Sequence, residues 1–489
     1  YCIHILLIFN MKIGSKLLLL LVLTLIIIFT EDIFPQFKPD AVGDVSIKKW
    51  KDDKTAAFSF TFDDCMQSQY DYVFPIFEQS GFKGTFYVIT GPLDDPTGPY
   101  WRYGTWPEFI EMSNAGNEIA SHTVTHPHLQ NLPIGDTLTA GTLRYELYQS
   151  RKSIENKIPD KYCIDLAYPY SEYDNDVLNY TAEFYEVARA ISDNPVDSSL
   201  SGQQWYKIGS LVIEFSLPRN TPSDDLDELQ EFYGYVDNTV SQGKWGLLQA
   251  HDVIPFDSIA SAIGQGSYQP ISVQWFDSAC QYVSDAEANG DLWVAPVMDI
   301  TRYMKERECY NYNILSVTDT SLKINITDTL NNNIYNFPLT ADIIVPDNWS
   351  TVSVFQGSFY DYTSSYSSGG STIIETSVIP DGGTVTLYKG LVSAINELTQ
   401  KPGEFRLYQN YPNPFNPFTT IRFTLPSDGT VSLKIYNSIG EEVKTIEQNS
   451  LARGSHQIIF DASNLPSGIY YYRLNSGSYS AVKKMILLK

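Results

Sequence analysis

Over residues 40–309 the chain alternates between short continuous apolar runs and longer segments whose apolar positions repeat with helical spacing. Apolar runs that alternate with helices predict a parallel sheet or a barrel. The predicted strands are 56–62, 84–89, 117–121, 163–168, 246–250 and 292–295. The predicted helices are 70–80, 106–115, 145–158 and a last one that ends at Arg307.

From residue 310 the pattern changes to two-residue alternation, which is typical of strands with one face in a core. Segment 321–326 alternates in this way, and Asn, Gly and Ser turns separate it from its neighbours. We therefore expect a β-sandwich over 310–391 and a linker over 392–403. A second all-β domain is expected over 404–489, where 431–436 again alternates strictly.

One apolar run near the N-terminus differs from all the others. Residues 17–29 are apolar except for Thr24, and two lysines stand just before them. A basic start followed by a short apolar run is typical of a secretory signal peptide, and the run is short for a membrane span. We expect Met11 to be the start, residues 1–36 to be upstream residues plus signal peptide, and 37–309 to form the barrel domain. A signal anchor is the alternative.

Composition narrows the classes of partner. The 33 basic and 57 acidic residues give a net charge of −24, which speaks against nucleic acid and anionic membrane surfaces as partners. We expect contact with a membrane only through export or surface attachment. The 43% apolar and 18% charged residues describe a globular protein. At 489 residues the chain is too long for one ordinary core, so we expect several domains.

Short polar motifs stand at the ends of three predicted strands. Asp63 and Asp64 end the first strand, His122 and His126 follow strand 117–121, and His251 ends strand 246–250. The Asp pair alone could form a turn, and the His pair alone could be ordinary surface polarity. Because the carboxyl ends of parallel strands meet at one edge, the motifs together predict a divalent metal site.

The residue types also predict that some of these side chains bind the metal and another transfers a proton. One carboxylate and two neutral imidazoles suit a divalent ion of borderline softness that keeps a position open to water. A second carboxylate beside them, left off the metal, is placed to take a proton from that water. This combination is typical of a metal hydrolase. His128 follows Pro127 directly and is expected to be peripheral.

Four segments resemble motifs of the NodB-type polysaccharide deacetylases, carbohydrate esterase family four. They are Thr61-Phe62-Asp63-Asp64, Ser121-His122-Thr123-Val124-Thr125-His126-Pro127, Ala167-Tyr168-Pro169-Tyr170 and Leu247-Leu248-Gln249-Ala250-His251-Asp252. The resemblance covers about residues 50–305 and implies a distorted (β/α) barrel with a Zn²⁺-type ion that activates water to attack an acetyl carbonyl.

The resemblance also implies a role for each matching residue. Asp64, His122 and His126 would be the metal ligands. Asp63 would be the general base, and His251 the acid that protonates the leaving amine or alcohol. The backbone N–H near Tyr170 would help to hold the oxyanion.

The chain departs from the family pattern in two places. Many members carry an arginine at the position of Ala167, where it braces the catalytic aspartate. No segment matches the fourth motif, although Trp205 could form part of a hydrophobic wall or simply belong to the core. Tyr168, Tyr170 and Trp245 are candidates for contact with sugar rings, with core packing expected for at least one.

The last domain resembles a type A sorting domain of type IX secretion. The resemblance rests on Leu407-Tyr408-Gln409-Asn410-Tyr411-Pro412-Asn413-Pro414-Phe415-Asn416-Pro417, on Gly468-Ile469-Tyr470 and on the terminal 483–489. It implies a Bacteroidetes-type bacterium, type IX secretion machinery as a partner, and export through the periplasm to the medium or the cell surface. A sugar-binding β-module is the alternative.

Together these patterns predict a secreted, metal-dependent deacetylase that acts on an N- or O-acetylated polysaccharide. Zn²⁺ is the expected ion, with Co²⁺, Ni²⁺ and Mn²⁺ left open by the ligand set. The alternative is a catalytically weak, surface-displayed glycan-binding protein that relies on the 310–391 sandwich. The missing arginine at position 167 favours this alternative, and the complete set of Asp and His residues favours the enzyme.

Overall fold

The computed structural model describes residues 41–95, 102–159, 161–213, 228–357, 359–390, 405–408, 410, 413, 415, 418–438, 440–451, 453–462, 464–477 and 479–487. The expected signal peptide, the linker and much of the 407–417 motif lie outside these residues. Within them, no helix combines the length and the hydropathy that a bilayer crossing requires.

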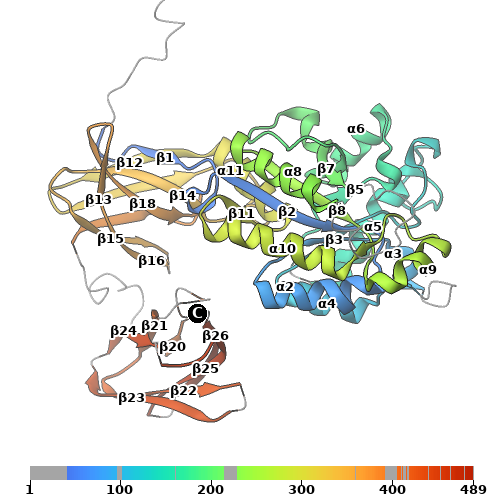
Figure 1. The fold of residues 1–489 in the computed structure, drawn as a ribbon. Helices are drawn as coiled ribbons and strands as arrows, with labels where there is room; N and C mark the ends of the chain where they lie inside the picture. The colour runs from blue at the N-terminus through green and yellow to red at the C-terminus, as the bar shows by residue number, and fades with distance from the viewer. Residues whose placement is uncertain are drawn as a thin grey trace, which may run out of the picture. The chain divides into compact units, whose positions relative to one another are not determined.

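Seven parallel strands close into a barrel, as predicted (Figure 1). Neighbouring strands follow the order of the chain, and β8 returns to pair with β2 along its whole length. The strands are β2 (Ala56–Phe62), β3 (Thr85–Val88), β4 (Glu118–Ser121), β5 (Asp165–Ala167), β6 (Val187–Ile191), β7 (Ile208–Val212) and β8 (Trp245–Ala250). An eighth strand, β11 (Leu292–Val294), pairs with the beginning of β2 while β3 pairs with its end, which distorts the barrel.

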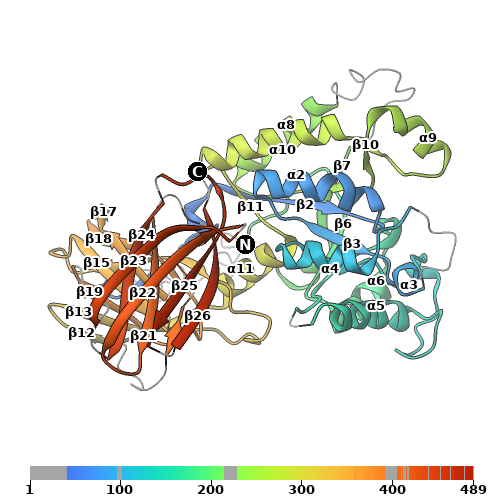
Figure 2. The ribbon, with the colours of Figure 1, turned by 90° about the horizontal axis from the view of Figure 1, so that it is seen from below.

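Helices cover the outside of the barrel, as the two views in Figures 1 and 2 show. They are α2 (Phe74–Ser80), α3 (Thr90–Asp94), α4 (Trp106–Asn114), α5 (Leu143–Lys157), α6 (Asn175–Phe184), α8 (Leu229–Gln242), α9 (Ile259–Gly264), α10 (Val273–Ala288) and α11 (Val297–Cys309). Local sequence explains where several begin: Thr105 and Glu108 form a capping box at α4, and Asp174 caps α6 through the Val177 N–H.

The two faces of β2 explain how the barrel holds a polar site. Phe58, Phe60 and Phe62 point outward into an aromatic layer with the covering helices, where Phe62 stacks on Phe86 at 4.9 Å between ring centroids. The alternate residues Ser59 and Thr61 are also buried and donate hydrogen bonds to the carbonyl oxygens of Ala295 and Leu248. Polar groups therefore line one face of the strand that leads to Asp63.

A β-sandwich packs on the N-terminal ends of the barrel strands, and residues up to Gly390 form one compact unit. One sheet holds β12 (Asn311–Val317), β13 (Ser321–Thr327), β19 (Val385–Lys389), β15 (Thr351–Gln356) and β16 (Phe359–Ser364). The other holds β1 (Val45–Ile47), β14 (Leu339–Val345), β18 (Ser371–Val378) and β17 (Tyr366–Ser368). Strand β1 precedes the barrel in sequence yet pairs with β14.

The C-terminal unit is a second antiparallel sandwich with its own core. Its sheets are β20 (Arg406–Leu407), β21 (Phe418–Leu425) and β24 (Gly454–Asp461), and β23 (Glu442–Leu451), β22 (Gly429–Asn437), β25 (Gly468–Ser476) and β26 (Tyr479–Leu487). The alternation predicted for 431–436 is confirmed, because Val431, Leu433 and Ile435 are fully buried.

Candidate metal centre

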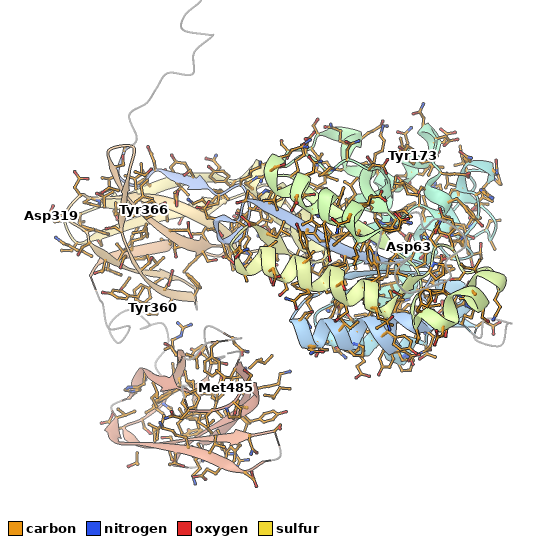
Figure 3. The ribbon with its side chains drawn as sticks, in the orientation of Figure 1. Asp63, Tyr173, Asp319, Tyr360, Tyr366 and Met485 are labelled. Atoms are coloured by element: carbon orange, nitrogen blue, oxygen red, sulfur yellow. The ribbon has the colours of Figure 1, made fainter. Side chains whose placement is uncertain are left out.

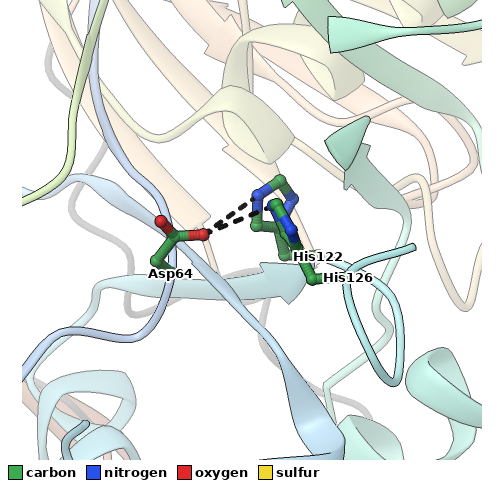
Figure 4. A group of neighbouring side chains, drawn as sticks. All are labelled: Asp64, His122 and His126. Carbon is green, nitrogen blue, oxygen red and sulfur yellow. Dashed lines mark ion pairs between the residues drawn. The ribbon is translucent and has the colours of Figure 1, made fainter. Parts of the chain in front are cut away.

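The Asp and His motifs meet at the C-terminal end of the barrel (Figure 4). Asp64 follows β2, and His122 and His126 follow β4. The Oδ1 atom of Asp64 lies 3.5 Å from Nε2 of His122 and 3.5 Å from Nε2 of His126. The three residues predicted as ligands therefore present one oxygen and two nitrogens to a common point.

The loop that carries His126 is held by one buried carboxylate. Glu146 on α5 accepts hydrogen bonds from the backbone N–H groups of Val124 at 2.9 Å and Thr125 at 2.8 Å, and from the Thr125 hydroxyl. Thr123 and His126 both have left-handed backbone conformations, with φ of 68° and 57°. Non-glycine residues rarely adopt this conformation, so the Glu146 contacts offset its cost and fix the loop.

The orientation of His122 is set by a backbone group. Its Nδ1 lies 2.8 Å from the carbonyl oxygen of Ala167 and can donate a hydrogen bond to it. This leaves the lone pair of Nε2 directed at Asp64, which is the arrangement that metal-binding histidines usually show. Ala167 thus contributes to the centre through its main chain.

Burial and mutual interactions shift the pKa values of the three side chains in different directions. Burial opposes ionisation of Asp64, but the nearby His122 and His251 rings outweigh it and lower its pKa. Burial likewise opposes protonation of His122, but Asp63 and Asp64 raise its pKa. Burial and the neighbouring His122 lower the pKa of His126 to about 4, so its imidazole is neutral at pH 7.

These donors fit a divalent transition-metal ion. Among the described residues, the buried Oδ1 of Asp64 has no hydrogen-bond partner. A buried carboxylate oxygen without a partner is costly unless a cation compensates it. One carboxylate and two imidazoles are a ligand set that Zn²⁺ and its neighbours accept.

Asp63 has a different set of partners, dominated by Arg189 on β6. The Nη2 atom of Arg189 lies 2.5 Å from both carboxylate oxygens of Asp63, and the two side chains are almost completely buried. Gln249 donates a further hydrogen bond to Oδ2 at 3.0 Å, and Arg189 also donates to Gln249 and Ser210. The guanidinium therefore fixes the carboxylate and balances its charge.

Arg189 takes the place of the arginine that many family members carry at the position of Ala167. In the register of β5 and β6, Ala167 pairs with Arg189, so the guanidinium enters the barrel from the adjacent strand. Position 167 is alanine, as noted from the sequence, yet Asp63 still has an arginine partner. Sequence reasoning missed Arg189 because the run 187–191 was not assigned as a strand, although an arginine inside an apolar run signals a buried charge that needs a partner.

A cleft of about 470 Å³ opens beside Asp64, which is one of its lining residues. His251 follows β8, lines this cleft, and places Nε2 3.9 Å from Oδ2 of Asp63. Tyr268 stands edge-on to the His251 ring and is 51% exposed. Arg102 lies in the same cleft and forms an ion pair with Asp252.

Tyr170 contacts two histidines of the segment that follows β4. Its side chain is 55% exposed, packs against the edge of the His126 ring, and stacks on His128 at 4.1 Å. His128 is outside the ligand group and bonds Glu172 at 2.8 Å. Trp205, Tyr168 and Trp245 are buried in the cores, so of the aromatic candidates for sugar contact only Tyr170 is exposed.

Two family models match this chain. Residues 51–185 match the model described as polysaccharide deacetylase, which covers the first barrel strands with Asp63, Asp64, His122 and His126. Residues 409–488 match the model described as secretion system C-terminal sorting domain. A curated protein named gellan lyase, from Bacillus sp., is 26% identical over 366 residues, or 73% of this chain. The chain spans about 14% of that relative's length.

Two of the similar solved structures are described as deacetylases. A deacetylase from Streptococcus pyogenes in complex with acetate is 23% identical, with 35% of this chain and 69% of that chain covered and a TM-score of 0.28. A putative polysaccharide deacetylase from Mycobacterium smegmatis is 16% identical, with 55% and 96% covered and a TM-score of 0.37. The family models, the barrel and its NodB-like motifs establish that this chain contains a polysaccharide deacetylase domain, followed by a secretion system C-terminal sorting domain.

Proposed function

We propose that this protein is a secreted, metal-dependent deacetylase that hydrolyses N- or O-acetyl groups of a polysaccharide. The observation that carries the proposal is the convergence of Asp64, His122 and His126, with Asp64 also lining an open cleft. The polysaccharide deacetylase model covers these three residues and Asp63.

Asp64, His122 and His126 would hold the ion, which we expect to be Zn²⁺, with Co²⁺, Ni²⁺ or Mn²⁺ as substitutes. A bound ion of this kind lowers the pKa of a coordinated water from 15.7 towards roughly 7 and polarises a carbonyl oxygen. The hydrogen bond from His122 Nδ1 to Ala167 keeps Nε2 free for this purpose.

Asp63 would act as the general base. Arg189 and Gln249 hold its carboxylate in one orientation, so Oδ2 is prepared to accept a proton without reorganising. Proton transfer by a positioned side chain contributes about 10²–10⁴-fold to a rate. The separation of Asp63 from the ligand group supports this role, because a carboxylate on the ion would be a poorer base.

His251 would act as the general acid and Tyr170 as an oxyanion donor. Nε2 of His251 faces the cleft within 3.9 Å of Asp63 Oδ2, where it can donate a proton to a leaving nitrogen or oxygen. The backbone N–H of Tyr170 would stabilise the developing oxyanion, an interaction worth roughly 3–4 kcal/mol.

The substrate class and location follow from the two family matches. A polysaccharide is the expected substrate, and the curated relative is itself named after one, gellan. The sorting domain supports export by type IX machinery, through the periplasm, to the medium or the surface of a Bacteroidetes-type cell. The alternative, a catalytically weak glycan-binding protein, loses one of its arguments because Arg189 contacts Asp63.

Acetate release by the purified full chain tests the proposal. Acetylated chitooligosaccharides, peptidoglycan and acetylxylan would each be incubated with Zn²⁺, with Co²⁺ and with chelator. We expect release from at least one substrate, its loss with chelator and its return with added metal. Bound metal without release from any of the three would contradict the proposal.

A further inference from the structure

The sheet that contains β15 and β19 has one face in the sandwich core and one face turned outward. Val352 and Val354 of β15 and Leu387 of β19 are fully buried in the core. Because successive residues of a strand point to opposite faces, the residues between them form the outward face. This outward face is separate from the deacetylase cleft, because the sandwich packs at the opposite end of the barrel strands.

Aromatic rings gather on this outward face in two adjacent rows. In the first row Ser353 lies between Tyr388 on β19 and Tyr362 on β16. In the second row Phe355 lies between Thr386 and Tyr360. Figure 3 labels Tyr360 on β16. The Phe355 ring lies 4.9 Å from that of Tyr360 and 5.9 Å from that of Tyr388.

Large and small residues alternate along the two rows, and the Phe355 ring contacts those of Tyr360 and Tyr388. Ser353 is fully buried and Thr386 is 9% exposed, although both point outward. The rings of Phe355, Tyr360 and Tyr388 are half-buried, and Tyr362 is 45% exposed. We call Phe355, Tyr360, Tyr362 and Tyr388 the aromatic platform.

The chemistry around the platform is unusual for a protein contact. The outward positions of β13, β19, β15 and β16 carry only Ser, Thr, Asn, Tyr, Phe and one lysine, Lys323. These four described strands place no aliphatic side chain and no carboxylate on that face. Protein interfaces bury aliphatic as well as aromatic groups at their centre, whereas a sugar ring offers C–H groups to an aromatic face and hydroxyls to Ser, Thr and Asn.

Charge also distinguishes this face from the rest of the chain. The whole chain carries a net charge of −24, yet the platform is surrounded by neutral hydroxyl and amide groups and by Lys323. Neither a neutral nor an acidic glycan would meet repulsion there. The polysaccharide deacetylase domain in the same compact unit indicates that glycans are the relevant ligand class.

We propose that the aromatic platform is a glycan-binding surface that holds a polysaccharide chain through stacking on its rings. This binding does not depend on the proposed catalysis, because it uses the sandwich and no residue of the barrel. On an insoluble or polymeric substrate it would raise the local concentration of acetyl groups near the cleft.

Direct binding by the full chain tests this surface. Affinity electrophoresis in gels that contain glycol chitin, soluble xylan or gellan would compare four proteins, all with Asp63→Asn to prevent turnover. They are the parent, Tyr362→Ala, the Tyr362→Ala/Tyr388→Ala double variant, and Tyr366→Ala as a matched control. Tyr366 is 40% exposed but lies on β17 in the other sheet.

We expect the parent to be retarded by at least one glycan, and the double variant to bind it about tenfold more weakly, which corresponds to the loss of two ring contacts. Tyr366→Ala should bind like the parent. Should the double variant fail to fold, Tyr362→Ala alone, at the most exposed ring, carries the test. Equal binding by parent and platform variants, or no binding to any glycan, overturns the proposal.

Two further measurements distinguish glycan binding by the platform from the proposed catalysis and from a protein–protein contact. With Asp63 restored, the double variant should release acetate from a short acetylated chitooligosaccharide at the rate of the native chain. Glycan binding without acetate release would contradict the proposed enzyme and leave the platform intact. A change in oligomeric state of the double variant in sedimentation, with unchanged glycan binding, would assign the platform to protein contact instead.

Discussion

Asp63 and Asp64 are neighbours in sequence, but their side chains meet different partners. Asp64 has a left-handed backbone, with φ of 68°, and directs its carboxylate towards two imidazoles. Asp63 continues the direction of β2 into the barrel and meets a guanidinium. A single backbone turn at the strand end therefore gives the proposed ligand and the proposed base different surroundings.

Replacing Asp63 by asparagine tests this separation. The amide cannot accept the proton, so acetate release should fall about 10²–10⁴-fold. Metal content, measured by elemental analysis after gel filtration, should stay the same because Asp64, His122 and His126 are untouched. Loss of metal together with activity would show that Asp63 is a ligand and that the two carboxylates were assigned wrongly.

Replacing Arg189 by alanine should lower both the stability of the protein and its acetate release. The change leaves the Asp63 carboxylate buried without its cation, which costs about 3–5 kcal/mol in the free energy of unfolding. Urea unfolding measures this loss, and acetate release should fall with it because Asp63 is no longer oriented.

Moving the arginine provides the control for that experiment. Ala167 and Arg189 are paired in register, so an Ala167→Arg/Arg189→Ala double variant places a guanidinium on the neighbouring strand within reach of Asp63. We expect it to recover stability and activity over Arg189→Ala. A double variant no better than the single variant would mean that the exact strand position matters beyond charge and hydrogen bonding.

At the scale of elements, α11 connects the barrel to the sandwich through a buried acid. Glu306 is completely buried, and both its oxygens accept from the backbone N–H of Phe337, at 2.9 and 3.1 Å. Burial raises the pKa of Glu306 to about 8 despite this hydrogen bond. The protonated form is therefore favoured in the folded protein, while the unfolded chain ionises near pH 4.3.

This shift predicts a pH-dependent stability with a definite sign. Between about pH 4.3 and 8 the folded state binds one more proton than the unfolded state at Glu306, so its stabilising effect is lost as pH rises. The free energy of unfolding should fall over this window by as much as a few kcal/mol. Glu306→Gln should flatten this fall in urea unfolding from pH 5 to 8, whereas the exposed Glu308→Gln should not. Identical pH profiles for all three proteins would contradict the assignment.

At the scale of the whole molecule, the barrel and its sandwich share one core. Trp293 and Tyr303 of the barrel pack with Phe337, and β1 at the N-terminal side pairs with β14. A chain that ends at residue 309 would expose this core and leave β1 without a partner. The described residues after Gly390 form a second unit with its own core.

Two truncations test this arrangement. A chain that ends at Gly390 should be soluble and keep the thermal transition and the acetate release of the full chain. A chain that ends at Cys309 should be insoluble or unfold at a much lower temperature, as followed by circular dichroism. A soluble, active 309-residue chain would show that the sandwich contributes nothing to the fold of the barrel.

The sequence by itself determined the features that depend on local pattern. The alternation of strands and helices, the two β-rich segments after residue 310, and the placement of Asp64, His122 and His126 at strand ends all follow from residues close together in the chain. The structure agrees with these predictions. Apolar residues that repeat at every second position or with helical spacing can be buried together in only a few arrangements of strands and helices. The roles of the site residues stay predictions.

Only the tertiary structure decided the features that depend on which distant strands pair. The β5–β6 register brings Arg189 next to Ala167 and so to Asp63, and β1 joins a sheet almost three hundred residues away. The same applies to exposure: Tyr168 and Tyr170 are two residues apart, yet Tyr168 is buried in the core and Tyr170 is exposed beside His126. Partners of buried charges and the exposure of aromatic rings are properties of packed surfaces, and a local pattern does not contain them.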